Sequence, residues 1–528
     1  MTSLAPLPIG ISTLRKIIER GCSYVDKTEI AYQLVSRPGP WFLSRPRRFG
    51  KSLFVDTLKE IFEGEEALFR GLYIHDKWDW SVKYPVIKLD FADGVMQTRA
   101  ELDQRIRVML IDNQSRLGVT CDAAHSDIAG CFAQLMRECH AKYGQRVVVL
   151  IDEYDKPILD NIEYPERATE VREGLKNLYS VLKGQDSHIH FIFVTGITKF
   201  SRVSLFSGLN QLQDITLSPR YATICGYTQQ DIETTFAGHL VGVDMAQLKH
   251  WYNGYKFLGE SVYNPFDVLL FISEGHRFRN YWFETGSPSF LIKLFQQRCY
   301  FLPDLEAIEV SEEILDSFDI ERIDPITLLF QAGYLTIDTA FNRLDEWVYR
   351  LRVPNHEVRM ALNNQFINAY ADIGLHRPAH KQHLFDALKQ GDVDACIAAV
   401  KRLFASIPWR NFTQNELPEM EGYYASVLYA FFASLNAHII PEDITNHGQV
   451  DLTIQLEGYT YVMEIKVSKR TKEADFVVEG RENAGLKQIQ SKKYSEKYRG
   501  SGKGVFEVGL IFGREARNLV QADWCKVL

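Results

Sequence analysis

"DLTIQLEGYTYVMEIKV", residues 451–467, predicts two antiparallel strands joined by a two-residue Glu-Gly turn at 457–458. The register set by this turn opposes three apolar pairs on one face: Leu452 with Met463, Ile454 with Tyr461, and Val450 with Ile465. The other face places Asp451 opposite Glu464, with Lys466 two residues along the same strand. Because opposed carboxylates repel unless a cation neutralises them, the hairpin predicts a binding site for a divalent metal ion.

The segments around the hairpin extend it to a domain that we place at residues 405–528. A helix with apolar residues on all faces is expected at 420–435, with Glu421 at its start. Three further elements complete this domain: a strand at 438–444, a lysine-rich helix at 485–498 and a strand at 505–512. Residues 464–503 hold 11 Lys and Arg against 6 Asp and Glu, a local basic excess that favours the approach of phosphates.

The N-terminal third contains a candidate phosphate-binding loop in WFLSRPRRFGKSLF, residues 41–54. The pattern is typical of a short strand, a basic turn and the start of a helix. Gly50, Lys51 and Ser52 supply the glycine, lysine and hydroxyl that bind phosphate and Mg2+ at a helix N-terminus. Arg45 stands where the general consensus has its first glycine. A basic surface loop is the alternative.

Two further apolar runs carry polar side chains near their ends. QRVVVLIDEYDKP, residues 145–157, predicts a buried parallel strand that ends in Asp152 and Glu153. We expect Asp152 to hold Mg2+ and Glu153 to activate the attacking water. HIHFIFVTGITKFS, residues 188–201, predicts a second strand, where Thr195 either senses the γ-phosphate or caps a turn. The alternation of strands and helices predicts a parallel sheet with helices on both faces and the binding of ATP.

Five segments of the N-terminal half form an ordered set of motifs. They are SYVDKTEIAYQL (23–34), FLSRPRRFGKSLF (42–54), VVLIDEYDKPI (148–158), TGITKFSRVSLFSGLNQL (195–212) and WYNGYKF (251–257). Together they resemble the bacterial AAA-ATPase-like family over about residues 1–290. That family usually has Arg-Pro-Arg-Arg-Phe-Gly-Lys-Ser as its phosphate loop, so Arg45 departs only from the general consensus. The resemblance implies a P-loop ATPase with a helical lid that begins near CGYTQQDI.

The same resemblance implies which residues contact the nucleotide. We expect ATP to be bound by Arg45, Arg47, Arg48, Phe49, Gly50, Lys51, Ser52, Leu53, Asp152 and Thr195, with Mg2+ held by Ser52 and Asp152. Arg47, Arg48 and Arg202 are the candidates for placing a cation beside the γ-phosphate. Ion pairing at the surface is the alternative role for these three arginines.

The middle of the chain, residues 301–404, predicts a helical, winged-helix-like connector. DPITLLFQAGYLTID (324–338) and WVYRLRVPNHEVRMAL (347–362) give the order helix, strand pair, helix, which is typical of a module that often touches DNA. A role as a spacer or in a protein contact fits this segment at least as well, because the segment is not notably basic. VPNHEV also recurs in the resembling family without an assigned mechanism, and we expect its His356 to be structural.

The C-terminal order of helix, three strands, helix and strand resembles the PD-(D/E)XK nuclease superfamily, in particular the small domain fused to AAA-ATPase-like proteins. The resemblance assigns Asp451 as the first acid, Glu464 and Lys466 as the E-x-K pair, Glu421 as the helix acid, and Gln488 with Tyr494 as a pair on the later helix. Asp451 and Glu464 would bind Mg2+, and Lys466 would orient the attacking water. Gln449 stands where the family usually has Arg, which removes one phosphate contact. A solvated polar hairpin face is the alternative.

The whole chain has the composition of a globular protein. Its 528 residues are 46% hydrophobic and 24% charged, with a net charge of -8, which predicts about three domains and argues against a surface built entirely for nucleic acid. The eight cysteines stand singly, as expected in a reducing cytoplasm. No uncharged apolar run approaches about 18 residues and the N-terminus lacks a signal-peptide pattern, so we expect a cytoplasmic protein without a membrane partner.

The sequence therefore predicts an α/β protein in four parts: a P-loop ATPase core at 1–225, a helical lid at 226–300, the connector at 301–404 and a nuclease-like domain at 405–528. We expect ATP and Mg2+ as cofactors and nucleic acid as the partner, with DNA favoured over RNA by the superfamily. A homo-oligomer formed through the ATPase domain and a role in defence against phage or mobile elements are further expectations. Two alternatives stay open: a nucleotide-operated switch that binds nucleic acid without cutting it, and an ATP site that never turns over beside an unregulated nuclease.

Overall fold

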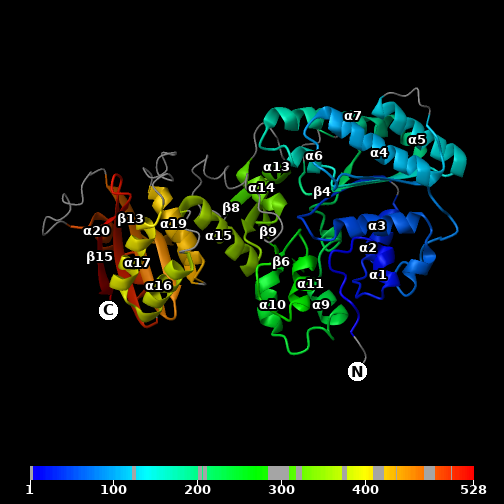
Figure 1. The fold of residues 1–528 in the computed structure, drawn as a ribbon. Coiled ribbons are helices and arrows are strands. Elements are labelled where there is room, and N and C mark those ends of the chain that lie inside the picture. Colours follow the sequence, from blue (N-terminus) through cyan, green and yellow to red (C-terminus); the bar gives the residue numbers. More distant parts are fainter. Residues whose placement is uncertain are drawn as a thin grey trace. The chain divides into compact units, whose positions relative to one another are not determined.

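The computed structural model describes most of the chain and divides it into two compact units (Figure 1). The described residues are 4–37, 39–121, 127–199, 205, 211–282, 308–316, 324–371, 377–407, 421–435, 437–468, 482–500 and 502–527. The first unit comprises Met1–Phe290 and Glu309–Glu357, and the second comprises Leu291–Ile308 and Val358–Leu528. None of the helices formed by the described residues has the length and apolar content needed to cross a membrane. The four-part division of the sequence stays a prediction.

The first unit is built on a five-stranded parallel sheet, as the sequence predicts. Its strands are β1 (Gly39–Ser44), β2 (Val86–Asp90), β3 (Val147–Asp152), β4 (Ile189–Gly196) and β5 (Gln213–Asp214), in the order β2-β3-β4-β1-β5. Figure 1 shows helices on both sides of it: α1 (Leu14–Glu19), α2 (Thr28–Val35) and α3 (Lys51–Phe62) on one, and α4 (Arg99–Leu117), α5 (Ile128–Tyr143) and α7 (Pro165–Gly184) on the other. All six side chains of β3 are buried, as expected for a strand covered on both faces. Because parallel strands end at one edge, the ends of β1 and β3 lie near each other.

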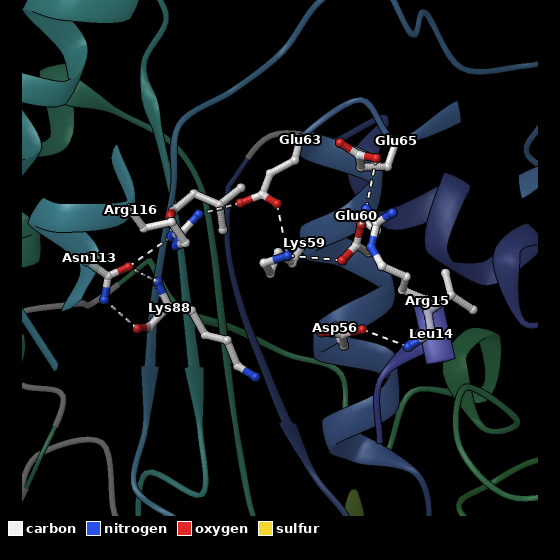
Figure 2. Close-up of polar contacts among 11 residues, drawn as sticks. Leu14, Arg15, Asp56, Lys59, Glu60, Glu63, Glu65, Lys88, Asn113 and Arg116 are labelled. Atoms are coloured by element: carbon white, nitrogen blue, oxygen red, sulfur yellow. Dashed lines mark hydrogen bonds and ion pairs between the residues drawn. The ribbon is translucent and has the colours of Figure 1, made fainter. Parts of the chain in front are cut away.

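Buried polar contacts hold α3, the helix that follows the phosphate loop, against α1 (Figure 2). Oδ2 of Asp56 accepts the backbone N–H of Leu14 at 2.7 Å. One turn later, Glu60 is only 3% exposed and accepts a hydrogen bond from Arg15 at 3.1 Å. Both acceptors lie on α3 and both donors lie at the start of α1. The two helices are therefore joined by charge-assisted hydrogen bonds as well as by apolar packing.

The same network continues from α3 to helix α4 and to the edge strand β2 (Figure 2). Lys59 contacts Glu63 at 2.9 Å, and Glu63 pairs with Arg116 of α4. Arg116 in turn donates to Oδ1 of Asn113 at 3.0 Å and to a backbone carbonyl of β2. The Asn113 amide bonds both backbone groups of Lys88 in β2. The helix that carries the phosphate loop is thus tied to α1, α4 and β2 at once.

Two smaller parts of the first unit follow the sheet. The segment predicted as a lid contains α9 (Gln229–Thr235), α10 (Met245–Tyr252), β6 (Asn253–Tyr255), β7 (Val262–Tyr263) and α11 (Pro265–Ser273), most of which contribute to one apolar core. The winged-helix-like part consists of β8 (Ile308–Ser311), α13 (Glu312–Asp316), α14 (Pro325–Ala332), β9 (Thr336–Arg343) and β10 (Glu346–Arg352), with the strand order β8-β10-β9. Helix α15 (His356–Ala371) then leads into the second unit.

The helix in the position of a DNA-reading helix, α14, is buried. Every side chain from Pro325 to Gln331 is buried. Gly333, which follows α14, packs so closely on Pro46 of the phosphate loop that an added Cβ would lie 2.8 Å from the proline Cβ. Oε1 of Gln331 accepts the backbone N–H of Lys199 at 3.1 Å. A buried helix cannot enter a DNA groove, so α14 makes a protein contact, the alternative that the weak charge of this segment favours.

The second unit contains a five-stranded mixed sheet. Its strands are β11 (His438–Thr445), β12 (Gly448–Leu456), β13 (Tyr459–Ser468), β14 (Gly504–Gly513) and β15 (Asn518–Val527), in that order; β13 and β14 are parallel and the other neighbours antiparallel. The helices are α16 (Arg377–Gln390), α17 (Val393–Ala405), α19 (Glu421–Ala433) and α20 (Ala484–Ser491). From α19 onward the order is helix, three strands, helix and strand, as predicted, and β15 is an additional strand.

The predicted register of the β12–β13 hairpin is confirmed near the turn and is wrong at its far end. The pairs Leu452 with Met463 and Ile454 with Tyr461 are present. The regular pairing stops at Leu452, and Val450 packs in the cluster that contains Val462 and Ile489 instead of joining that apolar face. Glu442, on the neighbouring strand β11, has a φ of 45° between two regular β11–β12 pairs. A register derived from the turn alone assumes regular pairing along the whole hairpin, whereas the β12–β13 pairing ends at Leu452.

Replacing Glu60 by Ala is expected to destabilise the first unit by about 1–3 kcal/mol, because Arg15 and Lys59 both lose a buried acceptor. Glu65→Ala is the matched control, since Glu65 also pairs with Arg15 but its side chain is 38% exposed. The control should cost less than about 1 kcal/mol. Urea unfolding followed by circular dichroism measures both variants, and equal losses would contradict the role of the buried contacts.

Candidate active sites

The phosphate loop joins β1 to α3. Gly50, the residue before α3, has a φ of 94°, a left-handed conformation that glycine adopts without strain. Lys51 begins the helix and is 4% exposed, and its Nζ donates to the carbonyls of Arg45 and Pro46 at 3.1 and 3.2 Å. The same ammonium lies 3.8 Å from Oε1 of Glu153. The loop thus holds a buried cation at a helix N-terminus, an arrangement that binds phosphate.

Asp152 lies at the end of β3, beside this loop. Burial, followed by the negative charges of Glu153 and Asp90, raises the pKa of Asp152 to about 6, and the Ser52 hydroxyl opposes the rise. Oδ1 of Asp152 accepts the N–H of Glu153 at 3.0 Å, whereas Oδ2 has no hydrogen-bond donor in the described part of the chain. A buried carboxylate oxygen without a partner, next to a hydroxyl, fits Mg2+. The structure therefore brings the two predicted metal ligands of the loop, Ser52 and Asp152, together.

Two residues expected to contact the nucleotide have their polar groups engaged elsewhere. Arg45 is 1% exposed and donates to the carbonyls of Ser44, Thr216 and Tyr221, at 2.9, 2.8 and 3.2 Å. Its guanidinium also lies 3.8 Å from the centre of the Phe257 ring, and burial lowers its pKa to about 10. Thr195 is buried within β4, and its hydroxyl donates to the carbonyl of Leu43 at 2.8 Å. These contacts of Arg45 and Thr195 hold the loop and the sheet in place, so their predicted role at the phosphates gains no support.

The remaining arginines of the loop differ in exposure. Arg47 is exposed. Arg48 is half-buried, has a φ of 66°, and places its guanidinium 4.0 Å from the centre of the Phe266 ring. Phe49 is buried and packs edge-to-face on Tyr255, with the ring centres 4.8 Å apart. Arg202, the third candidate cation, lies outside the described residues. Arg47 and Arg48 therefore stay the candidates that the structure describes.

An apolar pocket lies next to the loop. Its lining includes Gly50 and Leu53 from the start of α3, Tyr24 and Val25 from the N-terminal segment, and Tyr227 from the start of the lid. Both tyrosines are half-buried, and the loss of solvent around them raises the pKa of each hydroxyl well above its usual range. They are therefore neutral at physiological pH. Lys27, which pairs with Asp231, also lines the pocket, and the other lining groups are mainly apolar. A mainly apolar pocket beside a phosphate loop has the character of a nucleobase site.

Asp155 is a residue of this region that the sequence analysis did not select. It is fully buried, and burial, followed by the charge of Glu153, raises its pKa to about 6. Its carboxylate accepts the backbone N–H groups of Ile197 and Thr198 at 3.0 and 2.6 Å, together with the Thr198 hydroxyl. Asp155 thus fastens the end of β3 to the end of β4. The sequence could have pointed to Asp155, because it is the third acid of IDEYD, after Asp152 and Glu153.

The second unit brings the predicted carboxylates of the hairpin together. Oδ2 of Asp451 accepts the backbone N–H of Ile465 at 2.6 Å, next to Glu464 in the chain. Glu464 is 1% exposed; its Oε1 accepts Nζ of Lys466 at 2.8 Å, while Oε2 has no donor among the residues that the structure describes. Burial, followed by the charge of Asp451, raises the pKa of Glu464. This pair of acids with one unpartnered oxygen is again a site that fits a divalent cation.

Two further carboxylates border this pair. Nζ of Lys466 lies 3.9 Å from Oε2 of Glu421, which stands at the start of α19 and has a half-exposed side chain. Burial raises the pKa of Asp451, and the charges of Glu421 and Glu442 add to the rise. Glu442 was not selected from the sequence, although its position beside Asp443 in strand 438–444 could have drawn attention to it. Within the described ranges, no three His, Cys, Asp or Glu side chains have the spacing of a metal site.

Helix α20 packs directly on the strand that carries Glu464. An added Cβ on Gly485 would lie 3.0 Å from the Glu464 carbonyl, so only a glycine allows this approach. Gln488 follows three residues later, which places it on the same helix face as Gly485, and it is half-buried. Tyr494 is buried in the apolar cluster of this face. Gln449 is exposed. Gln488 thus lies one helical turn after Gly485, the residue that approaches the Glu464 backbone, and its role stays a prediction.

Two known families match separate parts of the chain. Residues 8–206 match the family described as "Predicted AAA-ATPase", and residues 419–522 match the PD-(D/E)XK nuclease superfamily. The first match contains the phosphate loop and Asp152, and the second contains Glu421, Asp451 and Glu464. No solved structure matches the chain.

A curated protein from Azotobacter chroococcum mcd 1, named "Uncharacterized protein in vnfD 5'region", is similar to the chain over almost its whole length. The two are 44% identical over 515 residues, which cover 97% of this chain and 98% of the relative. The chain therefore belongs to the AAA-ATPase-like family and carries a C-terminal domain of the PD-(D/E)XK nuclease superfamily.

Proposed function

We propose that the first unit binds and hydrolyses ATP and that this reaction controls a Mg2+-dependent nuclease in the second unit. The observation that carries the nuclease assignment is the buried Glu464, whose Oε2 has no donor among the described residues although Asp451 and Lys466 are beside it. A solvated hairpin face would expose both oxygens to water. A buried and incompletely neutralised carboxylate instead binds either a proton or a cation, and the second acid beside it, Asp451, makes a divalent cation the better fit.

In the first unit, each group has a separate task. The pocket that contains Tyr24 and Leu53 would take the adenine ring. Lys51 would exchange its two loop carbonyls for the β- and γ-phosphates. Ser52 and Asp152 would hold Mg2+, which offsets the negative charge of the phosphates. Glu153, 3.8 Å from the Lys51 ammonium, would orient and deprotonate the attacking water.

In the second unit, Asp451 and Glu464 would hold Mg2+, which lowers the pKa of a bound water and stabilises charge on the phosphate. Lys466 opposes the rise in the pKa of Glu464 through their 2.8 Å contact and would orient the attacking water. Glu421 lies near the same ammonium and would complete the acidic border of the site. These roles give hydrolysis of a phosphodiester bond as the reaction.

The partner that we propose is nucleic acid, with DNA preferred on the analogy of the superfamily. Exposed lysines on and after α20 support an approach of phosphates: Lys487, Lys492 and Lys493. Assembly of several copies through the ATPase part and a role in defence against phage or mobile elements rest on analogy with ATPase–nuclease fusions. The seven cysteines that the structure describes are all free thiols, which supports a cytoplasmic location.

A second function is favoured by one residue. Gln449 occupies the position where the nuclease family usually has Arg, and it is exposed two residues before Asp451. Without that guanidinium, the domain would bind the scissile phosphate less tightly. The alternative is therefore a nucleotide-operated switch whose second unit holds nucleic acid without cutting it.

Glu153→Gln should lower the rate of ATP hydrolysis by about 100-fold or more while ATP still binds, because the amide cannot accept a proton from the water. Glu166→Gln, an exposed change at the start of α7, is the matched control. Phosphate release and equilibrium binding of Mg2+·ATP measure the two effects separately. Unchanged turnover in Glu153→Gln would remove the assigned water activator.

ATP hydrolysis should also fall as the pH is lowered through about 6. Burial raises the pKa of Asp152 to this value, and a proton competes with Mg2+ for the carboxylate. A higher Mg2+ concentration should therefore move the fall to lower pH. Rates recorded between about pH 5 and 8 at two Mg2+ concentrations test this. A fall that is independent of Mg2+ would argue against Asp152 as the ligand.

Lys466→Ala should reduce Mg2+-dependent cleavage by roughly 100-fold, because the water and the phosphate lose their nearest cation. Lys503→Ala is the control, since Lys503 precedes β14 at the turn end of the hairpin, next to Tyr459. Supercoiled, linear and single-stranded DNA and RNA are the substrates, each with and without ATP. If the wild-type protein binds these substrates without cutting them, the result would favour the alternative function, a nucleotide-operated switch that holds nucleic acid.

A further inference from the structure

Three motifs of the first unit meet at two buried carboxylic acids that have no role in the proposed function. Asp267 lies on α11 in NPFDV and is 1% exposed, and Glu357 lies in VPNHEV, is the second residue of α15 and is fully buried. Gly254 of WYNGYKF packs on the carbonyl of Pro354, where no Cβ would fit. VPNHEV is the motif to which the sequence assigns no mechanism. Glu357, the acid of this motif, therefore has no assigned role.

The hydrogen bonds around these acids are incomplete. Oε1 of Glu357 accepts the backbone N–H groups of Tyr281 and Trp282, at 2.6 and 2.9 Å. Oε2 of Glu357 and both oxygens of Asp267 have no donor among the residues described. The two carboxyl groups are close enough to hydrogen-bond each other. Two ionised carboxylates cannot form such a bond and would repel in a buried site, so one proton is shared between them.

Charge decides which of the two acids keeps the proton. Burial raises the pKa of both, and that of Glu357 rises well above its usual range. The guanidinium of Arg48 opposes the rise for Asp267. Arg48 also lies over the ring of Phe266, the residue before Asp267, at 4.0 Å. The negative charge of the pair therefore rests on Asp267, facing Arg48, and Glu357 carries the shared proton.

Tyr255 supports the same arrangement. It is 1% exposed, and burial, followed by the negative charge of Asp267, raises its pKa well above the usual range. Its ring packs edge-to-face on Phe49, the neighbour of Arg48 in the phosphate loop. The acid pair is therefore connected to the loop twice, through Arg48 by charge and through Tyr255 by packing.

We propose that Asp267, fixed by the proton that it shares with Glu357, is a positioning residue for Arg48 and holds its guanidinium where the γ-phosphate of ATP develops negative charge. Arg48 lies two residues before Gly50 in the phosphate loop, and its left-handed backbone, with a φ of 66°, needs such support. The same pair would connect the nucleotide site to the first turn of α15. This inference rests on the proposed ATPase activity and assigns one of its residues.

The test compares ATP turnover by the full chain in four variants: Asp267→Asn, Glu357→Gln, Arg48→Gln and the double variant Asp267→Asn/Arg48→Gln. The Asn amide still donates to Glu357 but moves the negative charge away from Arg48, so kcat should fall by about tenfold or more, with KM for Mg2+·ATP nearly unchanged. Glu357→Gln should have the smaller effect, because its amide donates to Asp267 and leaves the charge there. The double variant should be no slower than Arg48→Gln alone.

Three results would overturn the positioning role: wild-type kcat in Asp267→Asn, additive losses in the double variant, or a larger loss from Glu357→Gln than from Asp267→Asn. Thermal unfolding shows whether each variant is folded. If Asp267→Asn does not fold, Asp267→Ser replaces it, because the serine hydroxyl also donates to Glu357. A wild-type chain without ATP turnover would contradict the proposed function itself, whereas normal turnover in both Asp267 variants contradicts only this inference.

Discussion

A carboxylate buried without a hydrogen-bond donor is the constraint that shapes both candidate sites. Oδ2 of Asp152 and Oε2 of Glu464 each lack a donor among the described residues, and burial raises the pKa of both groups. Leaving such a group ionised and unpaired costs several kcal/mol, so the carboxylate binds either a proton or a cation. Each site also places a lysine near its acids, Lys51 near Glu153 and Lys466 near Glu464, which supplies part of that charge. The remaining charge is what a divalent metal ion would contribute.

Local patterns predicted the parts of the fold that depend on neighbouring residues in the chain. The Glu-Gly turn set the pairs Leu452–Met463 and Ile454–Tyr461, since a two-residue turn leaves one register. The apolar run before Asp152 predicted a central parallel strand, because only a strand covered on both faces can bury every side chain. Gly50, Lys51 and Ser52 predicted a helix start, and α3 begins at Lys51. In each case the determining residues lie within a few positions of each other.

The features that sequence analysis missed depend on contacts between distant segments. Arg45 was expected at the phosphates, but the carbonyls of Thr216 and Tyr221, far away in the sequence, take its N–H groups. Val450 was assigned to the wrong side of the sheet because the regular β12–β13 pairing ends at Leu452, and Val450 packs with Ile489 of α20 instead. Asp267 on α11 and its partner Glu357 at the start of α15 are likewise about 90 residues apart in the chain. At this separation, sequence periodicity carries no information about contacts. The family resemblance located the catalytic motifs but gave no role to these supporting contacts.

The most direct test of the central claim is a calorimetric titration of Mg2+ into the nucleotide-free chain and its Glu464→Gln variant. The amide keeps the size of the side chain and removes the charge that Oε2 brings into the buried site. Wild type should bind Mg2+ in the second unit and release protons on binding, because burial raises the pKa of Asp451 and Glu464. Glu464→Gln should lose that binding event while Asp152 and Ser52 stay intact. Identical Mg2+ stoichiometry and proton release in the two proteins would contradict a metal site on the hairpin.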